Sequence, residues 1–275
     1  MHADDFDPAL PAVSVLIPAR NEAGALPALI AEIHAVLAAT PHEIVVIDDG
    51  SDDDTAAVLA RLAAGDPALV RRHHRQSQGK SAAMMSGAHA ARGAILLMVD
   101  GDGQNDPRFL PALLAPLADQ GTGLVAGQRT ERNSTYAKKI ASRIANRVRG
   151  ALLADGTRDT ACGLKAVRRD LYLALPYFET MHRFLPALVL AEGWRIAHVD
   201  VVDRPRVHGV SKYGLFDRLA VGVPDLFGVA WLIRRRRRRP PVLAAAPPAG
   251  STIIAPATLP SAAAPAAAFV TEPRS

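Results

Sequence analysis

The sequence predicts an α/β domain built as a three-layer sandwich, with helices on both faces of a mostly parallel sheet. Three observations lead to this fold class. Short apolar runs alternate with helix-compatible segments through the first half of the 275 residues. The runs carry almost no polar residues, as in strands that are buried on both faces. Each run ends in a polar cluster, and ligands of such sheets bind beyond the carboxyl ends of the strands.

Four strands are expected in the first half. We place them at "VSVLIPA" (13–19), "EIVVID" (43–48), "AILLMV" (94–99) and "GLVAG" (123–127). The polar clusters at their ends are "PARNE", "DDGSDDDT", "DGDGQND" and "GQR". Because parallel strands end at one edge of a sheet, these clusters are expected to gather there.

The segments between the strands have helix-compatible compositions: "AGALPALIAEIHAVLAA", "DDTAAVLARLAAG" and "GKSAAMMSGAHAARG". After residue 130 the pattern changes to a basic helical stretch, "YAKKIASRIANRVRGALLA", followed by "DTACGLKAVRRD". A helical region from Glu179 and a strand-like "RIAHVDVVDRP" come next. We expect this second half to complete the site for a second substrate.

Composition divides the chain into four regions. Residues 1–10 are expected to be flexible, residues 11–214 hold the folded domain, residues 215–239 form a helical segment with an arginine run, and the Ala/Pro-rich residues 240–275 are expected to be disordered. The acidic N-terminus lacks the features of a secretory signal, which predicts an intracellular domain. A single cysteine, Cys162, excludes an internal disulfide framework and is expected to be a buried thiol.

The segment 215–233 is expected to form an amphipathic helix rather than a membrane span. Its longest uncharged run before the arginines, "LFGVAWLI", is far shorter than the roughly 20 residues that a span needs. Such a helix can lie in a membrane interface or pack on its own domain as a surface helix. The apolar residues that recur at helical spacing are Phe216, Leu219, Val223, Phe227 and Ala230.

The arginine run Arg234–Arg239 supplies most of the basic character of the chain. The formal net charge is +5, and without these residues it would be close to zero. Arginines beside an interfacial helix attract an anionic membrane surface by about 1 kcal/mol each, whereas a solvated charge run is the alternative. No aromatic-interleaved basic surface or zinc-finger spacing accompanies the run, so no nucleic acid partner is expected.

Common phosphate and metal motifs do not account for the polar clusters. "QSQGKSAA" is not a P-loop, because His74 stands where the first glycine belongs. "DGDGQND" is not a dinucleotide fingerprint, because Asp106 replaces the third glycine. It is not a calcium loop either, because Asn105 replaces the turn glycine and Pro111 the terminal glutamate.

The "DGDGQND" cluster instead fits a divalent cation that bridges to a diphosphate. In extended chain Asp100 and Asp102 would point the same way, and Gln104 follows them. Gly101 and Gly103 leave room for phosphates to approach. An acidic turn that caps a helix at Asp106–Pro107 is the alternative, and it does not explain Asp100.

The "DDGSDDDT" cluster has two interpretations. Asp48 and Asp49 can accept hydrogen bonds from a base or a ribose, with "PARNE" contributing to the same ligand. Alternatively, Ser51 or Asp52 caps a helix that starts near Asp53.

Seven segments in order resemble motifs of glycosyltransferase family 2 enzymes of the dolichyl-phosphate mannosyltransferase type. They are "VSVLIPARNE", "EIVVIDDGSDDDT", "GKSAAMMSGAHAARG", "MVDGDGQNDP", "GQR", "DTACGLKAVRR" and "RPRVHGVSKYG", and they cover about residues 13–214. The resemblance implies a GT-A-type, Rossmann-like fold and transfer of a hexose from GDP-mannose or a UDP-sugar to a polyprenyl phosphate. "MHRFLPAL" and the ending "DLFGVAWLIRRRRR" resemble bacterial homologues that use undecaprenyl phosphate.

The resemblance also implies roles for single residues. Mg²⁺ or Mn²⁺ would be held by Asp100, Asp102 and Gln104. The nucleotide sugar would be bound by Pro18, Arg20, Glu22, Asp48 or Asp49, Lys80, Gly101 and Ser211. The lipid phosphate would be received by Arg129 and Arg143, although Arg143 can equally be a surface arginine. Catalysis would fall to Asp100, Asp102, Arg129, Arg206 and Lys212, the last two closing over the phosphates with Ser211.

The acceptor is expected to be an anionic phosphate, because no general base is evident in the sequence and a phosphate monoester needs none. Direct displacement with inversion follows. The alternatives are a family 2 transferase that acts on a glycan or soluble hydroxyl, and a non-catalytic membrane adaptor. We expect a peripheral protein at the cytoplasmic face of the membrane, which reaches the lipid through the 215–239 segment or through a membrane partner protein.

Overall fold

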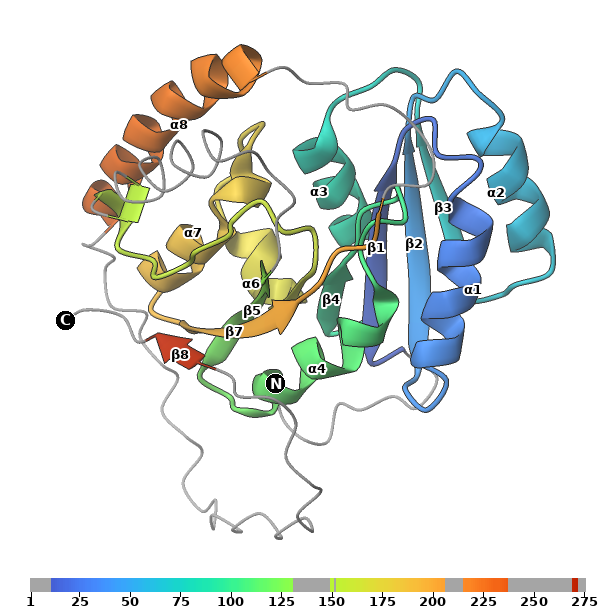
Figure 1. Cartoon of the computed structure of the whole chain (residues 1–275), viewed down its shortest axis with the longest axis horizontal. Helices are drawn as coiled ribbons and strands as arrows, with labels where there is room; N and C mark the ends of the chain where they lie inside the picture. The colour runs from blue at the N-terminus through green and yellow to red at the C-terminus, as the bar shows by residue number, and fades with distance from the viewer. Residues whose placement is uncertain (1–10, 131–148, 151, 206–214, 237–268, 272–275) are drawn as a thin grey trace, which may run out of the picture.

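The computed structural model of the chain describes residues 11–130, 149–150, 152–205, 215–236 and 269–271. It confirms the α/β three-layer sandwich. One sheet, with the strand order β3-β2-β1-β4-β6-β5-β7-β8, lies between two layers of helices (Figure 1).

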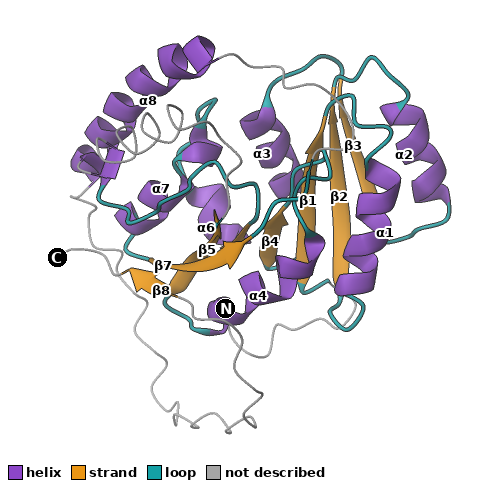
Figure 2. Cartoon of the chain, viewed as in Figure 1, coloured by secondary structure: helices purple, strands orange, loops and turns teal. Residues whose placement is uncertain are grey.

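The N-terminal half of the sheet is parallel, as predicted. β1 (Val13–Ala19) pairs with β2 (His42–Asp49) and β4 (Ile95–Met98), and β2 pairs with β3 (Leu69–His74). The connections contain α1 (Leu26–Val36), α2 (Thr55–Ala64) and α3 (Lys80–Ala90). The strand β3 lies at the edge of the sheet (Figure 2). The sequence did not predict it, because it leaves the side chains of residues 71–73 exposed and carries no apolar run.

The second half of the sheet is mixed. β6 (Lys165–Arg168) lies between β4 and β5 (Thr122–Arg129) and runs antiparallel to both, whereas β7 (Arg195–Val201) is parallel to β5. The short helices of this half are η1 (Pro107–Phe109), α4 (Leu110–Leu114), η2 (Ala115–Ala118), α6 (Arg169–Ala174), η3 (Met181–Arg183) and α7 (Leu185–Ala191). The helical region expected from Glu179 thus consists of η3 and α7.

Two hydrophobic clusters hold the helices on the sheet. Successive strand residues point to opposite faces, so Val15 and Ile17 belong to one cluster and Leu16 to the other. The first cluster joins the sheet to α1, α2 and α4, and the second joins it to α3, α6, α7 and the C-terminal helix α8 (Leu215–Arg236). This arrangement leaves the carboxyl edge of the parallel strands to the polar loops.

The helix α8 packs on the domain through Val229 and Ala230, which are both buried. Of the predicted apolar positions, Ala230 thus faces the domain, as in the alternative of a helix packed on the domain, whereas Val223 and Phe227 are exposed. Trp231 is the other large apolar side chain exposed in the part of this helix whose burial is described. Within the described part of the chain, no helix combines the length and apolar character needed to cross a bilayer.

Three residues of the C-terminal tail differ from the expected disorder. Phe269–Thr271 form β8, which pairs antiparallel with β7 at the edge of the sheet. The sequence does not predict this strand, because three residues within an Ala/Pro-rich segment make no recognisable pattern. The predicted flexible N-terminus, most of the basic helical stretch and the residues Arg143, Arg206, Ser211 and Lys212 lie outside the described residues.

A buried carboxylate joins three segments at the amino edge of the sheet. Glu43 of β2 accepts hydrogen bonds from the Ser14 hydroxyl of β1 (2.7 Å) and from the backbone N–H (2.6 Å) and Nε (2.9 Å) of Arg92. The backbone N–H of Gly93 donates to Ser14 Oγ (2.8 Å). Burial disfavours the charged carboxylate, but these hydrogen bonds outweigh burial and lower the pKa of Glu43.

The substitution Glu43→Gln is expected to destabilise the protein by about 1–3 kcal/mol, because it leaves buried donors without a charged acceptor. The lowered pKa means that this stabilisation is complete above the unfolded-state pKa of about 4.3 and is lost as the pH falls through the folded-state pKa. Urea unfolding at several pH values measures both effects. The exposed Glu179→Gln is the control, and a difference that stays constant from pH 7 to pH 3 would contradict the expectation.

Candidate active site

The loops after β1 and β2 are joined by hydrogen bonds at the carboxyl edge of the sheet. The backbone N–H of Asn21 donates to Ser51 Oγ (2.9 Å), and the backbone N–H of Asp52 donates to Asn21 Oδ1 (3.0 Å). The backbone N–H of Glu22 donates to Thr55 Oγ1 (3.0 Å). The predicted gathering of polar clusters is thus confirmed for these two loops.

The alternative role of Ser51 or Asp52 as a helix cap is wrong. Helix α2 begins at Thr55, and the residue at its N-cap is Asp54, which makes no side-chain capping bond. Asp53 Oδ1 accepts the backbone N–H of Thr55 (2.9 Å) instead. The serine and the aspartate join the β1 loop rather than the helix.

Asp48 and Asp49 are buried, with exposed fractions of 1% and 5%. Asp48 accepts the backbone N–H of Ser51 (3.0 Å) and pairs with His73. Both carboxylates therefore shape the edge of the site from within. Whether either of them also contacts a nucleotide stays a prediction.

Asp49 organises the loop that leads into α3. Its carboxylate accepts the Ser77 hydroxyl (2.7 Å) and the backbone N–H groups of Gln78 (2.8 Å) and Gly79 (2.9 Å), and it pairs with His74 (2.7 Å). Burial opposes its charge, but these donors outweigh burial and lower the pKa of Asp49. Asp49 thus holds the three residues that precede Lys80, the first residue of α3.

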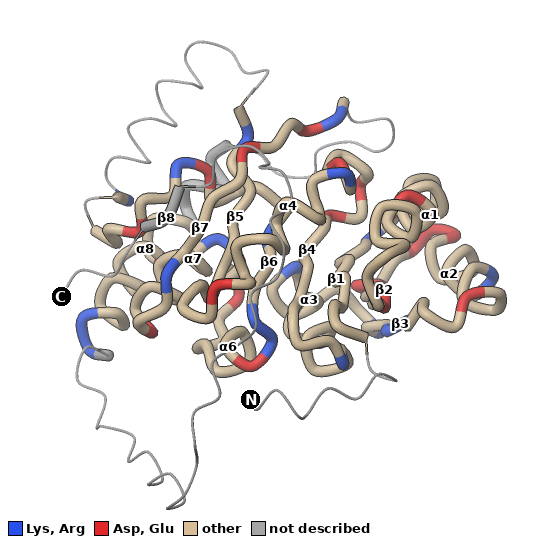
Figure 3. The backbone as a smooth tube through the Cα atoms, turned by 90° about the horizontal axis from the view of Figure 1, so that it is seen from below, with Lys and Arg blue, Asp and Glu red and all other residues tan. Residues whose placement is uncertain are grey.

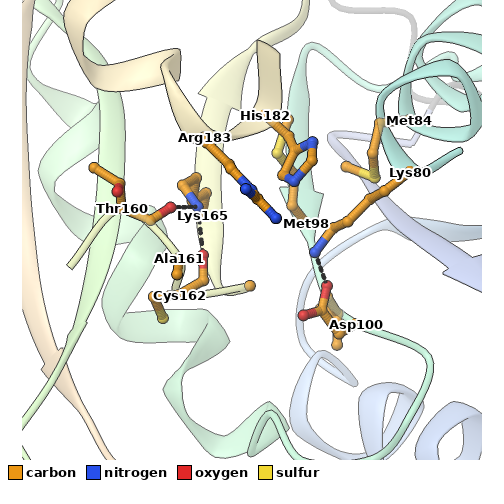
Figure 4. Close-up of a pocket in the computed structure, with 12 residues that line it drawn as sticks. Lys80, Met84, Met98, Asp100, Thr160, Ala161, Cys162, Lys165, His182 and Arg183 are labelled. Carbon is orange, nitrogen blue, oxygen red and sulfur yellow. Dashed lines mark hydrogen bonds and ion pairs between the residues drawn. The ribbon is translucent and has the colours of Figure 1, made fainter. Parts of the chain in front are cut away.

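Asp100 lies two residues beyond β4 and forms an ion pair with Lys80 (Figure 4). Burial opposes ionisation of this carboxyl group, but Lys80, Lys165 and Arg129 outweigh burial and lower its pKa. The chain from Asp100 to Asp102 makes a turn and is not the extended segment that the sequence analysis assumed. The backbone N–H of Asp100 donates to Asn105 Oδ1 (2.9 Å), which closes this turn.

The donor set of the turn suits a hard divalent cation. Asp100 and Asp102 offer carboxylate oxygens, and Gln104 offers an amide oxygen. No cluster of three His, Cys, Asp or Glu side chains that could hold a metal occurs among the described residues. Mg²⁺ is commonly bound by one or two carboxylates together with substrate phosphates, so a bound diphosphate would complete the coordination.

Arg129 lies between two carboxylates at the end of β5. Its Nε (2.5 Å) and one terminal nitrogen (3.0 Å) donate to Asp159, and the other terminal nitrogen donates to Asp203 (3.0 Å). Burial would lower its pKa, but the two carboxylates outweigh burial and raise it. Its predicted contact with the lipid phosphate stays a prediction, and the structure shows a bridge that ties β5 to β7.

A cavity of about 280 Å³ lies beside Asp100. Its charged and polar walls come from α3, from the segment that precedes β6, from β6 itself and from η3 (Figure 4). The lining includes Lys80, Asp100, Cys162, Lys165, His182 and Arg183. Lys165, His182 and Arg183 were not predicted as site residues, although the segments that contain them, "DTACGLKAVRRD" and "MHRFLPAL", resemble the family.

Lys165 supports the wall of the cavity from inside. Its ammonium group donates to the backbone carbonyls of Thr160 (3.3 Å) and Cys162. Burial lowers the pKa of Lys165 to about 8, so the side chain is mostly charged at neutral pH. Burial also raises the pKa of the Cys162 thiol to about 11, in agreement with the predicted buried thiol.

The sequence profile described as "Glycosyl transferase family 2" matches residues 14–175. Dodecaprenyl-phosphate galacturonate synthase of Rhizobium johnstonii is 33% identical over 228 residues, covering 81% of this chain and 67% of that protein. Undecaprenyl-phosphate 4-deoxy-4-formamido-L-arabinose transferase of Aeromonas hydrophila is 32% identical over 206 residues, covering 74% and 63%. The chain thus spans about two thirds of the length of these relatives.

Solved structures share the fold at lower sequence identity. Glucosyl-3-phosphoglycerate synthase of Mycobacterium tuberculosis, in complex with Mn²⁺, UDP and glucosyl-3-phosphoglycerate, has a TM-score of 0.61 and 23% identity, covering 81% of this chain and 80% of that chain. Mannosyl-3-phosphoglycerate synthase of Rubrobacter xylanophilus has a TM-score of 0.59 and 21% identity, covering 83% and 76%.

The substitution Gly163→Ala is expected to displace the carboxylate of Asp100. A Cβ atom at this position would lie 2.6 Å from Asp100 Oδ2 and 2.3 Å from Asn105 Oδ1. Substitutions that disturb the groups around a metal ligand weaken metal binding by roughly 10- to 100-fold. Titration with Mn²⁺ in the presence of a nucleoside diphosphate, followed by EPR, measures the change. Gly65→Ala, which meets no atom within 4 Å, is the control, and equal affinities for all three proteins would contradict the expectation.

Proposed function

The chain belongs to glycosyl transferase family 2, and we propose that it transfers a sugar from a nucleoside diphosphate sugar to a polyprenyl phosphate. One observation carries the proposal: Asp100 opens onto a cavity that is also lined by Lys80, Lys165 and Arg183. Carboxylates suit a divalent cation on the donor, and the cationic side chains suit phosphate groups. The names of the two relatives, which both contain a polyprenyl phosphate, support the same acceptor class.

The proposed cofactor is Mg²⁺ or Mn²⁺, held by Asp100 and Asp102 with Gln104. When bound, such a cation supplies charge neutralisation for the departing diphosphate. Lys80 already lies against Asp100, so its ammonium group is placed to contact a phosphate oxygen next to the carboxylate. Arg183, which also lines the cavity, adds a second positive charge.

The proposed reaction is a direct displacement with inversion. An oxygen of the acceptor phosphate forms a bond to the anomeric carbon while the bond from that carbon to the donor diphosphate breaks, and the electron pair leaves with the diphosphate. The acceptor oxygen is already anionic at neutral pH, so no side chain has to remove a proton. The chain contributes position and positive charge.

We further propose that α8 docks on an anionic membrane surface at the cytoplasmic face. Val223, Phe227 and Trp231 recur every four residues and are 48%, 60% and 60% exposed. Arg235 lies over the Trp231 ring (5.5 Å to its centroid), beside the exposed Arg234. Elsewhere in the described part, basic and acidic residues are interspersed (Figure 3). An apolar stripe next to a basic helix end can insert among lipid tails while the arginines contact anionic headgroups. A membrane partner protein could instead cover this face of α8, and the test below distinguishes the two.

The transfer itself is tested with undecaprenyl phosphate, Mg²⁺ or Mn²⁺, and a panel of radiolabelled UDP- and GDP-sugars. Labelled lipid is expected with at least one donor and only in the presence of the cation. Asp102→Ala should reduce the rate by about 100-fold or more, because several kcal/mol of charge stabilisation is lost. Extraction of the lipid product and counting measures the rate.

The matched control is Asp170→Ala, which removes a carboxylate that is 86% exposed in its side chain. Hydrolysis of the donor without labelled lipid would indicate a glycan or soluble hydroxyl acceptor. No turnover of any donor would contradict the enzymatic proposal and favour a membrane adaptor.

The membrane proposal predicts that the double substitution Phe227→Ser and Trp231→Ser reduces binding to vesicles that contain anionic lipid by at least about tenfold, because the buried apolar area is lost. Co-sedimentation of the full chain with such vesicles measures binding, and added salt should weaken it. Val202→Ser, which changes an apolar residue that is 45% exposed outside α8, is the control. Equal binding of all variants, or binding only when a membrane protein is present, would reject direct docking on lipid.

A further inference from the structure

His182 lies in the wall of the cavity that contains Asp100, but it carries no part of the proposed phosphate chemistry. It belongs to η3, and its ring lies between the side chains of Arg183 and Lys80, away from Asp100 (Figure 4). Every other ionisable side chain named in this wall is a cation, a metal-binding carboxylate or a buried thiol. A histidine at this position calls for a separate explanation.

The ring of His182 is held in one orientation by Ser81 of α3. The two side chains meet through Nδ1 and Oγ (2.7 Å), and Ser81 Oγ also accepts the backbone N–H of His182 (3.4 Å). Ser81 is completely buried, so solvent cannot compete for this contact. Within the described residues, Nε2 makes no hydrogen bond, which leaves it as the polar atom of the ring that a ligand in the cavity can reach.

The surroundings keep His182 uncharged. Burial, together with the positive charges of Lys80, Lys165 and Arg183, lowers its pKa well below the ordinary value. The imidazole is thus a neutral hydrogen-bonding group in a wall of charges. Phosphates and metal ions interact most strongly with charged groups, whereas a neutral imidazole matches a hydroxyl group, which can both donate and accept.

The cavity has the size and lining for one sugar ring. Its volume of about 280 Å³ lies below the roughly 300–1,000 Å³ of pockets for drug-sized ligands. Met84, Met98 and Val99 line it with apolar surface that can cover the C–H groups of a sugar. Because Asp100 binds next to the donor diphosphate in the proposed reaction, the sugar attached to that diphosphate is the group that enters this space.

We infer that His182, held by Ser81, hydrogen-bonds a hydroxyl group of the donor sugar and takes part in selecting that sugar. The inference rests on the proposed use of a nucleoside diphosphate sugar and does not depend on the acceptor. It assigns recognition of phosphate to the charged side chains and recognition of the sugar to a neutral one.

Isothermal titration calorimetry with the full chain and Mg²⁺ tests the inference without any transfer step. The probes are UDP-glucose, UDP-galacturonic acid and GDP-mannose, each compared with the UDP or GDP that lacks the sugar. His182→Ala is expected to weaken binding of the preferred sugar nucleotide by about tenfold or more, because a buried hydrogen bond to the sugar is lost. Binding of the free nucleotide should stay unchanged, and His182→Gln should restore most of the loss.

A deoxy-sugar nucleotide identifies the hydroxyl group. At the position that His182 contacts, removing the hydroxyl group and removing the imidazole should not have additive effects. The control is His89→Ala, an exposed histidine on the same helix as Ser81. Circular dichroism checks that each variant is folded. If His182→Ala does not fold, Ser81→Ala provides a second test. This variant should weaken binding of the sugar nucleotide but leave binding of the free nucleotide unchanged.

Two results would overturn the inference. One is equal weakening of the free nucleotide and the sugar nucleotide by His182→Ala, and the other is no change in either. Failure of the proposed function would look different. The wild-type protein would then bind sugar nucleotides with a His182-dependent preference, but it would transfer no label to undecaprenyl phosphate.

Discussion

The concentration of carboxylates at one edge of the sheet is the constraint on which the site depends. Like charges at close range repel, so each acidic group has to find a cation or a set of N–H donors. Asp100 pairs with Lys80, and Asp159 and Asp203 share Arg129. These partners come from different segments of the chain, so neutralising the acidic edge also joins separate segments within each half of the sheet.

The segment after β7 shows the same principle. Arg204 forms ion pairs with Glu32 of α1 (2.5 Å) and with Asp106 (2.8 Å), and its backbone N–H donates to the carbonyl of Gln104 (2.8 Å). Burial raises the pKa of Asp106, but hydrogen bonds from Arg108 and Arg204 outweigh burial and lower it to about 2. The acidic turn is therefore held in place by the charged groups of Arg108 and Arg204.

The sequence predicted the parallel half of the fold because apolar runs and terminal polar clusters are local features. It did not predict β3, where the exposed Arg71 and Arg72 interrupt the apolar pattern, and it predicted neither the strand β6 nor its antiparallel direction. The direction of β6 determines where Lys165 lies, because an antiparallel β6 pairs Lys165 with Met98 at the carboxyl end of β4. The acidic residues could be found from their spacing, whereas Lys165 and His182 become part of the site only through tertiary packing. Helical spacing likewise could not tell which apolar residues of α8 face the domain and which face solvent. The structure shows that Ala230 is buried and that Val223 and Phe227 are exposed.

A site made only of charges would bind phosphates of many kinds and would distinguish poorly between sugars. Strong discrimination requires buried polar groups that lose a partner when the wrong substrate binds. Such groups have to stay neutral, since a charged one would attract the phosphates instead. In this cavity burial lowers the pKa of His182, and the positive charges of Lys80, Lys165 and Arg183, which suit phosphate, lower it further. The same three cations can therefore bind the phosphates and leave one uncharged group free to recognise the sugar.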